Sequence, residues 1–283
     1  MGTNFSLRSL LSETSLPPNE ARILMAYVLD QHYQLPRSAL LSRDDMQLNA
    51  EAFNVWQSLE SKRLQGEPIA YLIGKRGFHN IDLHVGPGVL IPRPETELLV
   101  EIGLREIRRV EQAGKTVNVL DLGTGSGAIA LAIANDAPNV KVTATDQSPN
   151  ALAIAQTNAK YLGLESRVQF FQGSWYEAFD AKVTFDLILS NPPYIANQDP
   201  HLLQGDLRYE PIDALTDHAS GLTCLEIIID RSPDYLKPNG LIAVEHGFDQ
   251  SAAVVTLMKS AGFSDIQVHQ DLAGLNRVVS ARK

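Results

Sequence analysis

Cysteine is nearly absent from this chain: Cys224 is the only one among 283 residues. A single cysteine cannot form a disulfide within the chain, and such usage is typical of a reducing cytoplasm. Apolar runs of membrane-spanning length are also missing, and the amino terminus lacks a basic segment followed by an apolar one. We therefore expect a cytoplasmic protein with no membrane partner.

Basic residues are not in excess, because 24 lysines and arginines stand against 33 aspartates and glutamates, for a net charge of −9. Such a chain has no overall attraction for phosphate backbones, so nucleic acid is not an expected partner. The seven histidines show no spacing typical of metal ligands, and we expect no metal. The composition, 44% hydrophobic and 20% charged, is that of a globular protein with one or two cores.

The first part of the chain, residues 1–75, has a helical pattern and no strand signal. Leu24 follows an expected N-cap at Asn19, and Trp56 follows a second expected N-cap at Asn49. We predict a small helical domain here. Its role is either packing alone or recognition of a macromolecular substrate.

An alternating pattern follows the helical one. Apolar residues alternate over 81–85, Gly86-Pro87-Gly88 comes next, and residues 89–91 are apolar again. This pattern predicts a β-hairpin linker over residues 76–92, with its turn at the two glycines.

The remaining residues, 93–283, are expected to form the larger domain. After a helix from Pro94 to about Gly114, strands and helices alternate, which predicts a parallel sheet covered on both faces. Strands are expected at 117–121, 140–145, 168–171, 184–190 and 240–245, followed by an antiparallel edge hairpin of 266–268 and 277–281. The predicted fold class is α/β, with a doubly wound, seven-stranded, Rossmann-like sheet.

The first strand of this domain ends in the loop Asp121-Leu122-Gly123-Thr124-Gly125-Ser126-Gly127, which leads into a helix. Glycines let the backbone approach a ligand above the amino end of a helix. Gly123, Gly125 and Ala128 also fit the degenerate dinucleotide pattern, so a nicotinamide cofactor stays open. Asp121 favours S-adenosylmethionine, because a carboxylate attracts an ammonium and a sulfonium but repels a pyrophosphate.

Two further residues are candidates for contact with the cofactor. Asp146 ends the second strand, from which its carboxylate can accept hydrogen bonds from both hydroxyls of a ribose. Trp175 follows the third strand, and its ring either covers an adenine or belongs to the core.

The tetrapeptide Asn191-Pro192-Pro193-Tyr194 ends the apolar run 185–189. Its two prolines fix φ and remove two backbone donors, which leaves carbonyl groups free to accept hydrogen bonds. Asn191 adds a side-chain carbonyl, and Tyr194 adds a flat ring with a polar tip. We expect this loop to hold a planar NH2 group, although an ordinary Pro-Pro turn would have the same sequence. Arg93 either faces the same site or caps a surface.

With these motifs in this order, the chain resembles the amino-methylating S-adenosylmethionine-dependent methyltransferases, and more narrowly the release factor glutamine methyltransferases. The resemblance covers nearly the whole chain. It rests on Ile91-Pro92-Arg93-Pro94-Glu95-Thr96-Glu97, the loop 121–127, Asn191 to Ile195, Glu210-Pro211 and Glu20-Ala21-Arg22. It implies a class I methyltransferase sheet for the larger domain.

The resemblance also implies a reaction. The enzyme would methylate the side-chain amide nitrogen (N5) of the glutamine in the Gly-Gly-Gln loop of class 1 peptide chain release factors, and would thereby tune translation termination. S-adenosylmethionine would contact Asp121, Gly123, Thr124, Gly125, Ser126, Gly127, Asp146, Trp175 and Asn191. Residues 191–194, with Arg93 nearby, would hold the glutamine. Asn191 and the Pro192 carbonyl would orient its nitrogen and stabilise the charge that develops on it, with no strong base and no metal.

Three alternatives remain open. A methyltransferase of DNA, RNA or ribosomal bases would use the same tetrapeptide on an exocyclic amine, but usually carries a basic groove. A non-catalytic nucleotide-binding protein would be expected to lose the acceptors that Asn191 and the prolines supply. A nicotinamide oxidoreductase would be recognised by the cofactor that co-purifies with it.

Overall fold

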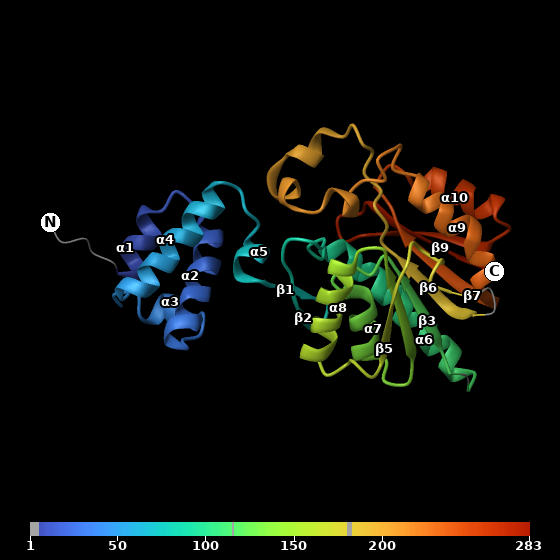
Figure 1. The fold of residues 1–283 in the computed structure, drawn as a ribbon, viewed down its shortest axis with the longest axis horizontal. Helices are drawn as coiled ribbons and strands as arrows, with labels where there is room; N and C mark the ends of the chain where they lie inside the picture. The colour runs from blue at the N-terminus through green and yellow to red at the C-terminus, as the bar shows by residue number, and fades with distance from the viewer. Residues whose placement is uncertain (1–5, 115, 180–182) are drawn as a thin grey trace. The chain divides into compact units, whose positions relative to one another are not determined.

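The computed structural model describes residues 6–114, 116–179 and 183–283 and divides into two compact units, Met1–Gly74 and Lys75–Lys283 (Figure 1). The first five residues of the predicted helical domain lie outside this description. Within the described residues, no helix is long and apolar enough to cross a membrane.

The smaller unit is a bundle of helices. They are α1 (Leu7–Glu13), α2 (Pro18–Tyr33), α3 (Ala39–Ser42), α4 (Ala50–Leu64) and α5 (Ile69–Ile73). Leu24 of α2 and Trp56 of α4 lie in its core, as their helical spacing predicts.

Only one of the two expected helix caps is confirmed. Asn49 caps α4 by accepting a hydrogen bond from the Ala52 amide at 2.8 Å. The expectation for Asn19 is wrong, because α2 begins one residue earlier, at Pro18. Proline suits the first position of a helix because its φ is already helical and its missing N–H has no partner there.

The larger unit contains the predicted seven-stranded sheet. Its strands are β3 (Asn118–Leu122), β4 (Lys141–Asp146), β5 (Val168–Gln172), β6 (Phe185–Ser190), β7 (Leu236–Glu245), β8 (Ser264–Gln270) and β9 (Asn276–Arg282). They lie in the order β5-β4-β3-β6-β7-β9-β8. The first five are parallel, and β9 pairs antiparallel with both β7 and β8, so the expected fold class is confirmed.

Helices cover both faces of this sheet (Figure 1). They are α6 (Glu97–Gln112), α7 (Ala128–Asp136), α8 (Pro149–Tyr161), α9 (Thr223–Tyr235) and α10 (Ser251–Ser260), with short 3-10 turns η1 (Pro94–Thr96), η2 (Pro200–Leu203), η3 (Gly205–Tyr209) and η4 (Ile212–Ala214). Val119 and Leu187 pack with α6 and α7, whereas Leu120 and Ile188 pack with α9 and α10. Strands buried on both faces explain the continuous apolar runs in the sequence.

The β-hairpin is present, but the predicted turn is wrong. It is formed by β1 (Lys75–Phe78) and β2 (Ile81–His84), so its turn lies at His79-Asn80 rather than at the two glycines. Phe78, Ile81 and Leu83 belong to the same core as α6 and α7. The alternating pattern therefore marked the second strand of the hairpin, and residues 89–91 form no strand.

The order of the strands reverses at one point of this sheet. The chain runs from β3 outward to β4 and β5 on one side, and from β6 to β7 on the other. β3 and β6 are therefore neighbours at the point where the order reverses, and open α/β sheets bind ligands beyond the carboxyl ends of such strands.

Candidate active site

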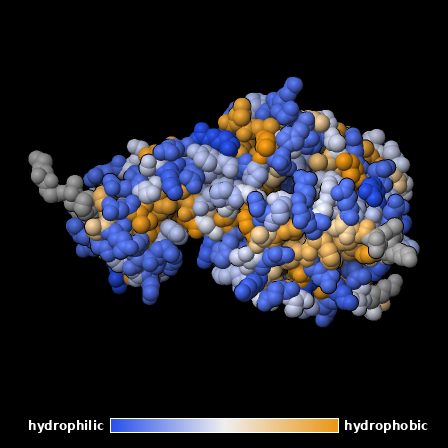
Figure 2. All heavy atoms as spheres, in the orientation of Figure 1, coloured by the Kyte–Doolittle hydropathy of each residue, from blue (hydrophilic) through white to orange (hydrophobic). Residues whose placement is uncertain are grey.

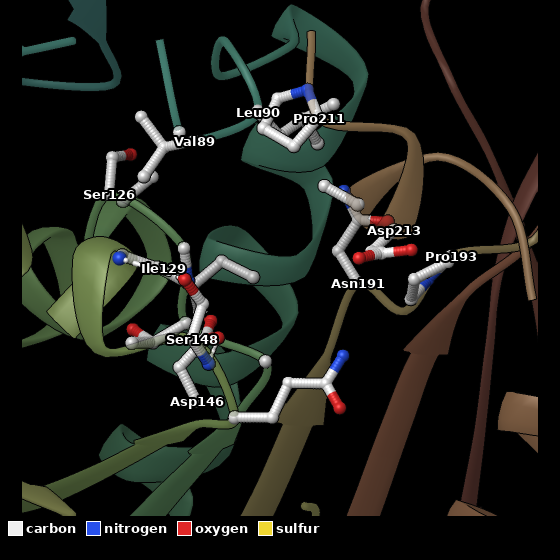
Figure 3. A pocket seen from close by; sticks show the side chains of 18 of the residues that line it. Val89, Leu90, Ser126, Ile129, Asp146, Ser148, Asn191, Pro193, Pro211 and Asp213 are labelled. Carbon is white, nitrogen blue, oxygen red and sulfur yellow. Dashed lines mark hydrogen bonds between the residues drawn. The ribbon is translucent and has the colours of Figure 1, made fainter. Parts of the chain in front are cut away.

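A cavity of about 490 Å³ lies beyond the carboxyl ends of β3 and β6. The loop 123–126 and the residues after β4 and β5 form one side of it. Asn191, Pro193 and Asp213 lie opposite Asp146 and Ser148 (Figure 3). We call the first side the cofactor wall, made of 123–126 and 146–148, and the second the acceptor wall, made of 191–194 and 211–214.

The cofactor wall is held by backbone hydrogen bonds between its loop and the end of β4. The Gly123 and Thr124 amides both donate to the Thr145 carbonyl at 2.9 Å. Gly123 and Gly125 have φ of +71° and +55°, a conformation that other residues adopt only with strain. At Gly123, an added Cβ would also lie 3.2 Å from the Trp175 ring. These glycines let the loop turn beneath a ligand.

Asp146 ties the loop to the end of β4. Its Oδ2 accepts from the Gly125 amide at 2.8 Å and its Oδ1 accepts from the Ser148 amide at 2.9 Å. Burial raises the pKa of this carboxyl, whereas the two amides lower it and partly offset the effect. Each carboxylate oxygen has a further lone pair, so Asp146 can still accept hydrogen bonds from a ligand in the cavity that it lines.

Asp121 lies behind the loop instead of on the cavity. It is completely buried, and its Oδ2 accepts from the Thr124 hydroxyl at 2.6 Å and the Ala130 amide at 3.2 Å. Its Oδ1 has no partner among the described residues. Burial raises its pKa to about 7, against the effect of those two hydrogen bonds and with a contribution from the charge of Asp146.

The acceptor wall depends on side chains from distant segments. The Asn191 Nδ2 donates to Thr96 Oγ1 at 3.0 Å, which leaves Oδ1 as the acceptor of this amide. The Tyr194 hydroxyl donates to Glu245 Oε1 at 3.0 Å, and the Tyr194 carbonyl accepts from Gln250 Nε2 at 2.9 Å. The loop after β6 is thus fixed at both of its ends.

A pair of opposite charges joins the rim of the cavity. Arg93 hydrogen-bonds to Glu210 Oε1, and Glu210 Oε2 accepts from the Ile91 amide at 2.9 Å. The Glu210 side chain is fully buried, and its burial raises its pKa although Arg93 and the Ile91 amide oppose the shift. These bonds join the segment before α6 to the segment that carries Pro211 and Asp213 on the acceptor wall.

The structure brings most, but not all, of the predicted site residues to the cavity. Its lining includes Arg93, Gly123, Thr124, Gly125, Ser126, Asp146, Trp175, Asn191 and Pro193. Outside the lining are Asp121, Gly127, Pro192 and Tyr194. Gly127 precedes α7 as its N-cap with φ of +86°, and Pro192 is buried. Trp175 adopts φ of +52° and packs beside Gly123, so its ring borders the cofactor wall.

Sequence reasoning missed three residues that support the two walls. Thr96 lines the cavity beside Asn191, and Glu245 stands behind the acceptor wall. Asn158 links the cofactor wall to β2 by donating to the carbonyls of Ser126 and His84 at 2.9 Å. Glu245 had a detectable signal, because it ends an apolar strand in the same way as Asp121 and Asp146. Thr96 lies in the segment 91–97 on which the resemblance rests, but the sequence analysis assigned it no role. Asn158 lies inside α8 and had no signal.

Comparison with known proteins identifies both units. Residues 97–205 match the family model described as the methyltransferase small domain, and residues 6–74 match the PrmC N-terminal domain. Among solved structures, a methyltransferase from Pyrococcus furiosus has a TM-score of 0.55 at 18% identity, covering 80% of this chain and 98% of that one. The 16S rRNA N2 G1207 methyltransferase of T. thermophilus has a TM-score of 0.53 at 19% identity, covering 74% and 49%. These two likenesses concern the fold.

Curated relatives are far more similar. The protein named release factor glutamine methyltransferase from Bordetella pertussis is 46% identical to this chain over 272 residues, which cover 96% of this chain and 97% of the relative. The protein of that name from Xylella fastidiosa is 47% identical over 93% of this chain and 92% of its own length. The protein of that name from Salmonella typhimurium is 40% identical over 96% of this chain and 94% of its own length. With its sheet, its cavity and this full-length similarity, the chain is a methyltransferase that belongs to the release factor glutamine methyltransferase family.

Proposed function

We propose that this enzyme transfers a methyl group from S-adenosylmethionine to the side-chain amide nitrogen (N5) of the glutamine in the Gly-Gly-Gln motif of class 1 peptide chain release factors. The main support is one observation: Asn191, in a loop of hydrogen-bond acceptors, lines the same cavity as Asp146 and the loop 123–126. Such a cavity can hold a charged cofactor and a planar amide side by side.

The residues of the cofactor wall fit S-adenosylmethionine. Its sulfonium supplies an activated methyl group. Asp146 would accept the ribose hydroxyls through the lone pairs that Gly125 and Ser148 leave free, and the loop 123–126 would let the amino acid part lie against the backbone. Asp121 lies beneath the loop with an Oδ1 that no described residue bonds, and a cationic cofactor above it would favour the ionised form of this carboxyl, whose pKa burial raises to about 7. Trp175 would cover the adenine.

The acceptor wall supplies what an amide nucleophile needs. An amide nitrogen is a poor nucleophile because its lone pair is delocalised into its carbonyl group. Asn191 Oδ1 would accept one hydrogen of the substrate NH2, and the carbonyl of the adjacent Pro192, which lies outside the cavity lining, would accept the other. The two bonds orient the nitrogen and strengthen as positive charge develops on it. The methylated amide cation is very acidic and would lose its proton to water or to these acceptors.

The surface beside the cavity favours a macromolecular substrate. Leu203 and Ile212 are 81% and 47% exposed, and orange side chains gather over this segment in Figure 2. Ile212 stands between Pro211 and Asp213, which line the cavity. Exposed apolar groups of this kind mark contact surfaces.

The helical domain of residues 1–75 has a role in the same proposal. It binds the release factor away from the reacting glutamine, so its deletion should raise KM for the protein substrate.

Intact-mass spectrometry tests the proposal. A class 1 release factor incubated with the enzyme and S-adenosylmethionine should gain one methyl group, and replacement of its Gly-Gly-Gln glutamine by glutamate should abolish the gain. Ribosomal RNA and DNA, in the same buffer with labelled cofactor, serve as competing acceptors. Label in either nucleic acid, with no mass change in the release factor, would overturn the proposal in favour of a base methyltransferase.

A further inference from the structure

The Asn191 amide can serve as an acceptor only in one of its two orientations. Its oxygen must face the substrate NH2, and a rotation of the amide by 180° would present a second NH2 group instead. Such a rotation leaves the shape of the side chain unchanged, so packing alone does not select the orientation. A hydrogen-bonding partner elsewhere in the protein must do so.

Thr96 is that partner, but its hydroxyl alone does not decide the orientation. A hydroxyl has one hydrogen to donate and two lone pairs that accept. In the structure Thr96 Oγ1 accepts from Asn191 Nδ2 at 3.0 Å. If the hydroxyl instead donated toward Asn191, the reversed amide would be equally well bonded. The direction of the Thr96 hydroxyl must therefore be set by its other neighbour.

That neighbour is Glu245, at the end of β7. The carboxyl is 1% exposed, Tyr194 donates to its Oε1 at 3.0 Å, and the nearby Thr96 hydroxyl lowers its pKa. Oε2 itself makes no hydrogen bond of normal geometry to any described residue. An ionised carboxylate accepts hydrogen bonds and cannot donate, so it forces the hydroxyls of both Tyr194 and Thr96 to point toward it.

We propose that Glu245 is a positioning residue that sets the hydrogen-bond polarity of the acceptor wall: the Thr96 hydroxyl donates to its carboxylate, the Asn191 NH2 donates to Thr96, and Asn191 Oδ1 is left to accept from the substrate. The inference rests on the proposed function, since it explains selection of an amide NH2. It also assigns a purpose to a buried acid that does not line the cavity.

The surroundings of Glu245 bring the pKa of its carboxyl close to neutral pH. Burial raises its pKa to about 7, hydrogen bonds from Thr96 and Tyr194 and the charge of Arg277 on β9 lower it, and Glu95 of η1 raises it. The adjacent His246 has a pKa lowered by burial and stays neutral near pH 7. Above pH 7 the carboxylate is ionised. Below it, a protonated Glu245 can donate to Thr96, and the amide orientation is released.

Glu245→Gln is the first test, because glutamine keeps the shape but has one acceptor and one donor. Both enzymes are assayed at pH 8 with a release factor and saturating cofactor. Relative to the wild type, we expect the variant to lose about 10-fold or more in kcat, while its Kd for S-adenosylmethionine changes by less than about twofold. Glu106→Gln is the matched control. Glu106 is also buried, but it bonds Arg109 and Arg282 on α6 and β9, so its loss should leave kcat unchanged.

Thr96 provides a second variant pair that does not alter Glu245. Thr96→Val removes the hydroxyl with little change in shape and should also lower kcat about 10-fold, whereas Thr96→Ser should restore most of the lost rate. A wild-type kcat that falls below pH 7, with this acid limb absent in Glu245→Gln, would support the proposal further. The pH profile separates a polarity role from simple support of the fold.

Binding of a release factor with glutamate in place of its Gly-Gly-Gln glutamine gives the sharpest readout. The wild-type enzyme should bind the glutamine form more tightly than the glutamate form. In Glu245→Gln the ratio of the two Kd values should fall about 10-fold, because a reversed Asn191 amide can donate a hydrogen bond to the glutamate carboxylate. Unchanged kcat and preference in both Glu245→Gln and Thr96→Val would overturn the inference while wild-type methylation stands. Failure of the wild type to methylate any release factor would instead overturn the proposed function.

Discussion

The two walls of the cavity are built in different ways. The cofactor wall is held mainly by the adjacent ends of β3 and β4, as in the bond between Gly125 and Asp146, which are 21 residues apart. The acceptor wall is held by Thr96, which is 95 residues from Asn191, and by Glu245, which is 51 residues from Tyr194. The first wall therefore resembles other nucleotide-binding loops, whereas the chemistry of the second depends on where the whole chain brings its polar groups. Perturbing each wall separately should produce different defects.

Removal of the Asn191 amide should have the largest effect. Asn191→Ala should lower the single-turnover rate by about 100-fold or more, because one preorganised hydrogen bond to the developing positive charge is lost. If the walls are separate in function, the Kd for S-adenosylmethionine measured by calorimetry should change much less. A rate within a few-fold of the wild type, at saturating cofactor and release factor, would contradict the role of the acceptor wall.

Removal of the Asp146 carboxylate should give the opposite pattern. Asp146→Ala should weaken S-adenosylmethionine binding by about 1.5 to 3 kcal/mol, since ribose hydroxyls lose charge-assisted partners and the Gly125 amide loses its acceptor. Titration calorimetry measures the change, and kcat at saturating cofactor should fall far less than in Asn191→Ala. Unchanged affinity would remove Asp146 from the cofactor site.

The sequence alone predicted the cofactor wall better than the supports of the acceptor wall. The order of strands and helices was predictable because parallel strands buried on both faces give short apolar runs, and glycines, Asp146 and residues 191–194 follow those runs directly. Thr96 and Glu245 stand at positions that a pattern marks, since Thr96 lies in the segment 91–97 and Glu245 ends an apolar strand. Their partners were not predictable, because a hydrogen bond between segments 95 or 51 residues apart leaves no local pattern. The displaced hairpin turn has a similar cause: the alternation from Phe78 was assigned to a single strand before Gly86, because β1 has only four residues and one buried side chain and shows no pattern of its own.

The pH dependence of stability should sharpen the contrast at Glu245. Its pKa rises from an ordinary value of 4.5 to about 7 in the folded protein, mainly through burial. The folded state therefore binds more protons than the unfolded state between these values, so this group destabilises the fold as pH rises through that window. Between pH 5 and pH 8, the unfolding free energy of Glu245→Gln should rise relative to that of the wild type by on the order of 1 to 2 kcal/mol.

Denaturant unfolding at several pH values measures this difference, and Glu106→Gln again serves as the control. Burial alone would raise the pKa of Glu106, but hydrogen bonds from Arg282 and Arg109 outweigh it and lower the pKa. Stability from Glu106 is thus fully present above about pH 4.5, so the cost of Glu106→Gln should be constant from pH 5 to pH 8. Parallel pH profiles for the two variants would argue against a raised pKa at Glu245.

The smallest effect is expected at the edge of the acceptor wall. Tyr194→Phe removes one hydrogen bond to Glu245 and leaves the ring in place, so kcat should fall about fivefold, equivalent to roughly 1 kcal/mol. Steady-state kinetics with a release factor measures it. A loss as large as that of Asn191→Ala would show that the tyrosine hydroxyl acts on the substrate directly, and the distinction between a contacting loop and its support would have to be redrawn.

The hydrogen bond between Ile91 and Glu210 has a consequence for how a newly made chain acquires activity. Its partners are 119 residues apart, so the loop that it closes is long and the entropy lost on closing it is large. Contacts of such separation slow folding, and a growing chain folds its earlier segments first. Gly125 can meet Asp146 soon after both have left the ribosome, whereas Tyr194 must wait for Glu245. The acceptor wall should therefore be the last part of the cavity to form in each newly made molecule.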